Sequence, residues 1–118
     1  MANALYDLGR EKFLTGAINW ASDNIKIVLV DAADYTVNLA THEFLSDIAV
    51  GGRVATSGNL TGKTTTAGVA DASDVTLTAV TGDPSEALVI YKDTGSAATS
   101  PLIAYIDTIK VRAIMTAE

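Results

Sequence analysis

Short runs rich in Val, Ile and Thr recur along most of the chain at a spacing of about ten residues, and this spacing is the strongest constraint on its fold. β-Branched side chains favour extended backbone, and the Gly, Asn, Asp and Ser residues between the runs favour turns. Such runs are typical of antiparallel strands, so we expect a mainly β fold, an antiparallel β-sandwich or jelly-roll-like barrel over residues 25–116. The runs are Ile25–Val30, Arg53–Ser57, Lys63–Val69, Asp74–Val80, Ala87–Lys92, Leu102–Asp107 and Ile109–Met115.

The run Ile25–Val30 is the clearest of these strands because it is apolar on both faces. Successive side chains of a strand point to opposite faces. One face therefore carries Ile25, Ile27 and Leu29, and the other carries Val28 and Val30. Both faces should be covered, and a helix at the amino terminus is the obvious cover for one of them.

One α-helix is expected before the strands, from about residue 3 to residue 18, where apolar residues and good helix formers precede Gly16. Its apolar arc is wider than one contact face requires. The helix is therefore either sandwiched between its own domain and a neighbour or simply well buried at home. The candidate interface residues are Tyr6, Arg10 and Phe13, together with Trp20, which could instead wedge between helix and sheet.

The segment between the first two strand runs contains weaker signals. Tyr35–Leu39 could form a short edge strand. Thr41 and the residues after it predict a capped helical turn that ends before Gly51.

Composition bounds the class of protein. A chain of 118 residues fits one domain, residues 1–118. With no Cys and a single His, disulfides, thiol catalysis and the common metal sites are excluded. The net charge is −6 and the eight basic residues are scattered, which argues against direct nucleic-acid binding. No secretory signal and no apolar run of about 18 residues is present, so we expect no membrane contact and synthesis in a host cytoplasm.

The segment Ser57–Thr64 resembles a phosphate-binding loop because it ends in Gly-Lys-Thr. That motif needs Gly where Ser57 stands, and it needs a helix to begin directly afterwards. The residues from Thr64 to Gly68 cannot start a helix. We interpret the segment as a hairpin turn and expect no nucleotide or other cofactor.

Catalytic and metal sites are equally hard to build from this sequence. His42 is the one possible imidazole base, and no nucleophile or orienting group is visible near it, so we expect an isolated surface histidine and no hydrolase. The carboxylate pairs Asp31 with Asp34 and Asp71 with Asp74 lack the dense oxygen ligands of a calcium loop. We expect neither catalytic residues nor a metal.

Two blocks of the sequence are distinctive, Gly82–Gly95 with its Leu-Val-Ile-Tyr run and Thr99–Asp107 with Ser-Pro-Leu-Ile-Ala-Tyr-Ile-Asp. Together with Ala4–Asp7, the Trp20 turn and Ile25–Asp31, they resemble a family of small virion structural proteins of tailed bacteriophages. The resemblance covers about the first nine-tenths of the chain. Such relatives would continue through a Gly-rich turn into further strands, whereas here residues 108–118 differ, which leaves the last strand pairing open.

The resemblance implies a non-enzymatic role in the virion. Within it we expect a capsid cement or decoration protein on the outer shell, a symmetric homo-oligomer that binds the major capsid protein. Many weak contacts repeated by symmetry would then stabilise the shell. The alternatives are a ring-forming protein of the tail, collar or baseplate, or a module that binds host-surface glycans.

Overall fold

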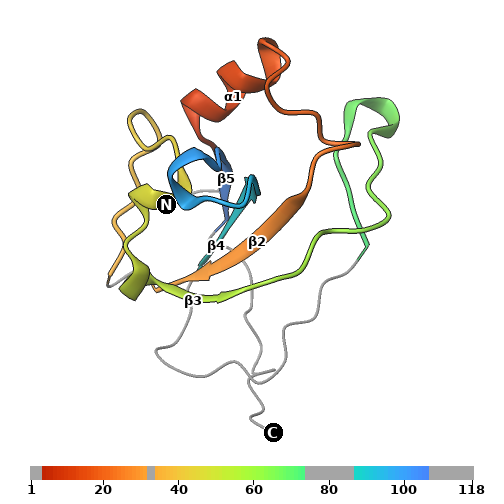
Figure 1. The fold of residues 1–118 in the computed structure, drawn as a ribbon. Helices are drawn as coiled ribbons and strands as arrows, with labels where there is room; N and C mark the ends of the chain where they lie inside the picture. The colour runs from red at the N-terminus through yellow and green to blue at the C-terminus, as the bar shows by residue number, and fades with distance from the viewer. Residues whose placement is uncertain (1–3, 32–33, 74–86, 107–118) are drawn as a thin grey trace, which may run out of the picture.

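The fold is a single open antiparallel sheet with one α-helix, seen in a computed structural model that describes residues 4–31, 34–73 and 87–106 (Figure 1). The strand order is β1-β5-β4-β2-β3. The α-helix is α1 (Asp7–Leu14). The strands are β1 (Ala4–Leu5), β2 (Ile25–Val30), β3 (Arg53–Thr56), β4 (Ala87–Lys92) and β5 (Leu102–Ile106), and the 3₁₀ turns are η1 (Leu45–Asp47), η2 (Val50–Gly52), η3 (Thr66–Gly68) and η4 (Ala97–Thr99).

The central strands confirm the prediction of a mainly β fold with one amino-terminal helix. β2 pairs with β4 along its whole length, from Ile25 opposite Lys92 to Val30 opposite Ala87. β5 pairs with the other side of β4, and β3 with the other side of β2. The described strands form one open sheet, so the second layer of a sandwich or the closure of a barrel is not found among them.

The helix is shorter than the predicted span of residues 3–18. Ala4 and Leu5 pair with β5 instead, and Tyr6 keeps extended backbone, so the helix begins at Asp7. It ends at Leu14, just before Gly16 adopts a φ of +81°. Ala4 and Leu5 are extended because they pair with a strand that is distant in the sequence, and local helix propensity carries no information about that partner.

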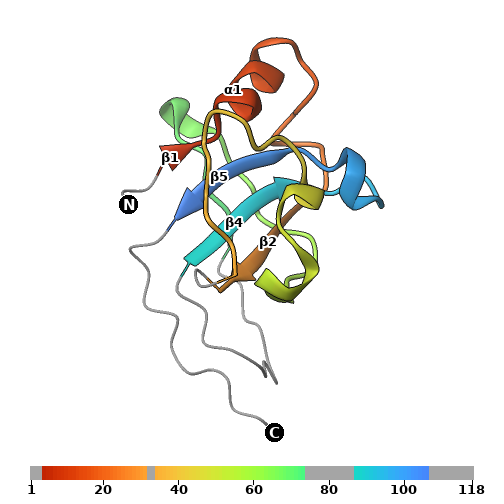
Figure 2. The ribbon, with the colours of Figure 1, turned by 90° about the vertical axis from the view of Figure 1, so that its left-hand side faces the viewer.

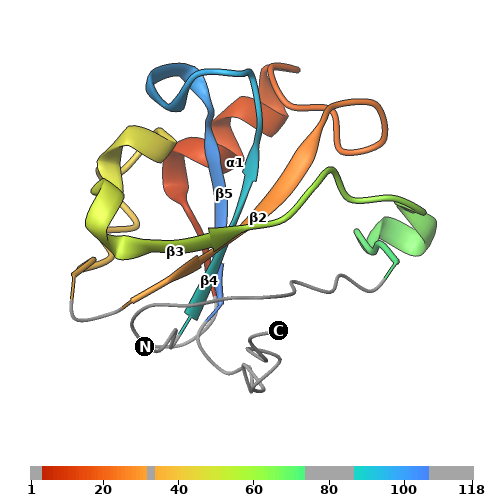
Figure 3. The ribbon, with the colours of Figure 1, turned by 60° about the horizontal axis from the view of Figure 1, so that its bottom comes forward.

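Two predicted strands are wrong. Tyr35–Leu39 is irregular rather than extended in the sheet. Lys63–Val69 is not a strand either, because Thr64 makes only an isolated bridge to Asp71. The chain between these two residues contains η3 and forms an excursion that projects from the sheet (Figures 1 and 3). The predicted strands at residues 74–80 and 109–115 lie outside the described residues.

One face of the sheet carries the larger apolar cluster, which we call the tyrosine face. Residues 34–48 cross over β5 and β4 on this side, in yellow and orange in Figure 2. Three of them, Tyr35, Leu45 and Ile48, are buried against the sheet. The other buried members are Tyr6, Val28, Val30, Ala87, Val89, Tyr91, Leu102 and Tyr105.

The opposite face carries a second cluster of Ile18, Ile25, Leu60, Ile103 and Ala104. β2 is therefore covered on both faces, as its sequence predicts. The helix is not the main cover of the tyrosine face. α1 lies against β5 instead, with Gly9 directly over the carbonyl oxygen of Leu102.

Candidate functional site

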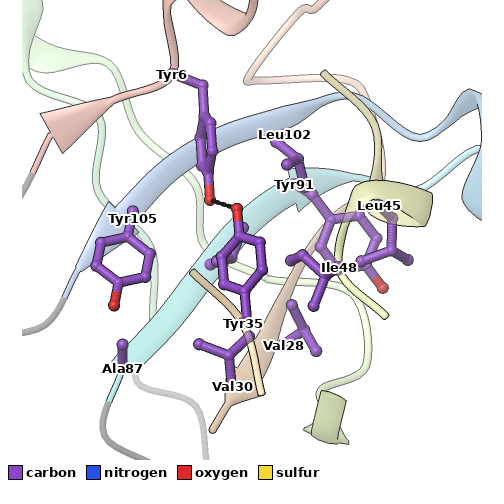
Figure 4. Packing of buried hydrophobic residues seen from close by; sticks show 11 residues of the cluster. Tyr6, Val28, Val30, Tyr35, Leu45, Ile48, Ala87, Tyr91, Leu102 and Tyr105 are labelled. Atoms are coloured by element: carbon purple, nitrogen blue, oxygen red, sulfur yellow. Dashed lines mark hydrogen bonds between the residues drawn. The ribbon is translucent and has the colours of Figure 1, made fainter. Parts of the chain in front are cut away.

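A chain of hydrogen bonds runs from the core of the tyrosine face towards the surface. The Tyr6 and Tyr35 hydroxyl oxygens are 2.7 Å apart (Figure 4). The Tyr35 hydroxyl lies 2.9 Å from Nδ1 of His42. Tyr6 is positioned by the junction of β1 and α1, where its backbone N–H donates to Ile103 of β5.

The direction of each bond follows from one backbone donor. The Asn38 N–H lies 3.3 Å from His42 Nδ1 and can only donate, so Nδ1 carries a lone pair and the ring proton is on Nε2. Tyr35 must then donate its hydroxyl proton to Nδ1. Its oxygen in turn accepts the proton of Tyr6, so every donor in the chain points towards His42.

The electrostatics of the two tyrosines agree with this order. Burial, and then donation to Tyr35, raises the pKa of Tyr6 far above its usual range. Burial raises the pKa of Tyr35 to about 12, although the bond that it accepts from Tyr6 works in the opposite direction. Both hydroxyls therefore stay protonated at neutral pH and cannot act as bases there.

The prediction that His42 is an isolated surface histidine is wrong. Its ring is half-buried, 5.3 Å from the Tyr35 ring between centroids, and Nδ1 accepts from both Tyr35 and Asn38. No Ser, Thr or Lys side chain joins this chain among the described residues. Tyr35 lies seven positions before His42 in a stretch without regular structure, so no periodic pattern in the sequence signals their contact.

In the Gly-Lys-Thr segment, the lysine side chain is engaged by a backbone group of the same chain. The Lys63 ammonium donates to the carbonyl oxygen of Asp23, in the loop before β2. The backbone before it runs beside β2, since the N–H groups of Ser57 and Leu60 donate to Ile27 and Ile25. The hairpin turn expected at residues 57–64 is therefore displaced to the bridge between Thr64 and Asp71.

The four candidate interface residues fall into different environments. Tyr6 is fully buried in the chain's own core, so it is corrected from a surface contact to a core residue. Arg10 is exposed and pairs with Asp7 at 2.5 Å. Phe13 is 36% exposed. Trp20 is half-buried beside the second cluster, and its Nε1–H donates to the backbone carbonyl oxygen of Asp71 at 3.3 Å.

Two more apolar side chains in or just before α1 are exposed to solvent. Leu14, the last residue of α1, is 87% exposed, and Leu5 just before the helix is 42% exposed. We call Phe13 and Leu14, which lie in α1, and Leu5, which precedes it, the helix apolar residues. They leave part of the predicted wide apolar arc exposed to solvent.

The described basic side chains are all engaged within the chain. Lys26 pairs with Asp93, and Lys92 with Asp23. Arg53 donates to two backbone carbonyls, of Ile48 and Leu45. The complete described set is Arg10, Lys12, Lys26, Arg53, Lys63 and Lys92.

Two other kinds of site, a metal cluster and a membrane span, are absent from the described ranges. No cluster of three or more His, Asp or Glu side chains suited to a metal ion occurs there. None of the helices found there is long and apolar enough to cross a bilayer. In comparisons with known proteins, no family model and no curated protein matches the chain.

Proposed function

We propose that this chain is a non-enzymatic structural protein of a tailed-phage virion, acting as a capsid cement or decoration protein. The observation that carries the proposal is the resemblance of the Leu-Val-Ile-Tyr and Pro-Leu-Ile-Ala-Tyr-Ile blocks, residues 88–91 and 101–106, to that family. These blocks form β4 and β5, the strands on which both apolar clusters are built. The resemblance therefore lies in the scaffold of the fold.

The polar chemistry of the described residues supports a structural role. Their only imidazole is held as an acceptor by Tyr35 and Asn38, and the tyrosines beside it stay protonated. Acyl or phosphoryl transfer would need a nucleophile beside a free base. A virion role needs none.

The charge distribution supports binding to protein rather than to nucleic acid. Because each described Lys and Arg already contacts an acceptor of its own chain, none is held ready to neutralise a phosphate. Exposed carboxylates such as Glu11 and Asp34 remain on the surface. A capsid partner would then supply the positive charge.

We propose the helix apolar residues as the contact with the particle, with the major capsid protein as partner. The helix is already packed on β5 through Gly9, so its outer side is held on a rigid support. Closure of the sheet into a sandwich or barrel belongs to the same proposal.

The test of the virion role is the copy number of the chain in purified particles, by quantitative mass spectrometry against the major capsid protein. A cement protein should be present on the order of hundreds of copies, in a simple ratio set by the symmetry of the shell. Tens of copies would instead favour a ring in the tail, collar or baseplate. Absence from the particle would contradict the virion role.

The test of the contact surface is Phe13→Asp, with Val69→Asp as the matched control. Val69 is an exposed apolar residue at 61%, on the excursion around η3 rather than on the helix. Both variants should fold, as judged by circular dichroism. Only Phe13→Asp should lose binding to particles that lack the protein; equal binding by both variants would exclude this surface.

A further inference from the structure

The turn at His42 is built so that a proton cannot be added to the ring without breaking hydrogen bonds. Nδ1 is the atom that must take up the proton, because the other ring nitrogen already carries one. Nδ1 accepts from the Asn38 N–H at 3.3 Å and from the Tyr35 hydroxyl at 2.9 Å. Both donors lose their acceptor when Nδ1 becomes a donor.

The effect reaches the buried end of the chain. A protonated Nδ1 would donate to the Tyr35 oxygen, and the Tyr35 proton would have to turn away from His42. That oxygen already accepts from Tyr6 at 2.7 Å, in the core of the tyrosine face. A buried donor without a partner is costly, so the rearrangement favours an opened segment.

We propose that His42 is an acid-sensitive latch: its protonation releases residues 34–42 from the tyrosine face. Histidine is the side chain that ordinarily changes charge between pH 8 and 5. The middle of the segment is joined to the rest of the fold by the Tyr35 hydroxyl, which bonds to Tyr6, by one backbone bond from Asp7 to Leu39, and by the packing of Val37 and Leu39 against the apolar cluster. The bonds of His42 lie within the segment and fix its shape, so their loss loosens the conformation in which Tyr35 reaches Tyr6. This inference does not depend on the virion role.

Residues 43–48 stay attached when the latch opens. The N–H of Leu102, in β5, donates to the carbonyl oxygen of Glu43. The N–H of Leu45 donates to the carbonyl oxygen of Ser100, which lies just before β5. The Glu43 carboxylate also pairs with Lys12 of α1 at 2.6 Å. The opening is therefore limited to the portion before Glu43, which gives the experiment an internal reference.

Of the titratable groups around His42, Asp47 is the one that opposes opening. Tyr6 and Tyr35 remain neutral through the acid range. The Asp47 carboxylate in η1 attracts a protonated His42 and so opposes opening. Glu43 next to it is neutralised by Lys12. In the proposed latch, the loss of the two bonds that Nδ1 accepts outweighs the attraction of Asp47.

The test is amide hydrogen exchange followed by NMR at about pH 7.5 and pH 5.5, expressed as protection factors so that intrinsic rates cancel. Protection at Tyr35 and His42, whose N–H groups bond to Asp31 and Asn38, should fall about tenfold at the lower pH. Protection at Leu45 should not change. Equal or greater protection of Tyr35 and His42 at pH 5.5 would overturn the proposal.

Two variants separate the latch from general acid sensitivity. His42→Gln retains a side-chain acceptor but cannot be protonated, so its protection factors should be the same at both pH values. Asp47→Asn removes the opposing charge and should enlarge the loss at pH 5.5. An acid loss that persists unchanged in His42→Gln would also overturn the proposal. If His42→Gln does not fold, Tyr35→Phe, which removes one of the two donors, should show a smaller acid loss than the wild type.

Discussion

At the scale of single residues, Tyr35 joins the core to the surface through one hydroxyl. That hydroxyl accepts from Tyr6 and donates to His42, so it satisfies two other polar groups as well as itself. Tyr91, on the same face, is as deeply buried, but its hydroxyl has no hydrogen bond among the described residues. The two tyrosines therefore form a matched pair for measurement.

Tyr35→Phe should lower the free energy of unfolding by about 1–3 kcal/mol, because it leaves the buried Tyr6 hydroxyl without its acceptor. The measurement is urea unfolding followed by circular dichroism. Tyr91→Phe is the control and should change the free energy by less than about 0.5 kcal/mol. Equal losses in the two variants would mean that burial, and not the hydrogen-bond chain, sets the cost.

The tyrosines should also resist alkaline titration. The pKa values of Tyr6, Tyr35 and Tyr91 are raised, chiefly by burial. Since each folded pKa lies above the unfolded value of about 10, their contribution to stability is complete below pH 10 and is lost as the pH rises towards 12. Absorbance at 295 nm should show far less tyrosinate at pH 10.5 in the native protein than in urea; equal absorbance would contradict the buried placement.

At the scale of elements, the packing of α1 on β5 depends on the absence of a side chain at Gly9. A Cβ built there would overlap the carbonyl oxygen of Leu102, which is backbone and cannot turn away. The sequence shows only a glycine within a helix, which is normally unfavourable. The reason for it becomes visible only when β5 is placed beside the helix.

Gly9→Ala should therefore destabilise the protein, although alanine is the better helix former by about 1 kcal/mol. Overpacking against fixed backbone should lower the free energy of unfolding by about 1–3 kcal/mol. Thermal and urea unfolding would measure the change. Gly51→Ala is the control, because its Cβ would meet no atom within 4 Å. A more stable Gly9→Ala variant would contradict the close approach of α1 and β5.

At the scale of the whole molecule, carboxylates bind the loops to the sheet. The Asn19 N–H and then Lys92 lower the pKa of Asp23, and Lys26 and then the Gly95 N–H lower the pKa of Asp93. For Asp47, burial raises the pKa, but the N–H groups of Glu43 and Phe44 outweigh it and leave the pKa lowered. Asp23 and Asp93 hold the end of the sheet where β2 begins and β4 ends, and Asp47 lies in the segment over the tyrosine face.

Stability should consequently fall in acid. Each of the three folded pKa values lies below the unfolded value of about 3.9, so the stabilisation is present above pH 4 and is lost as the pH drops through the folded values. Urea unfolding between pH 6 and pH 2.5 would measure this loss. Lys26→Met removes the main cause of the Asp93 shift and should make the loss shallower. An identical slope in the variant would contradict the role of the Lys26–Asp93 pair.

The sequence by itself determined the central strands. Val, Ile and Leu on both faces of Ile25–Val30 require cover on both sides, and Ala87–Lys92 is a short run that contains the strand-forming residues Val, Ile and Tyr. β4 has the predicted bounds, and β5 begins at the predicted residue. These are local patterns, and local backbone preference agrees with the final fold there.

Tertiary structure alone decided the rest. Ala4 and Leu5 are strand rather than helix because β5 offers them a partner, and Tyr6 is core rather than interface because the same pairing turns it inwards. The chain from Tyr6 through Tyr35 to His42 joins residues 29 and 7 positions apart in segments without a shared period. Contacts between distant segments depend on how the elements pack, and sequence periodicity carries no information about them.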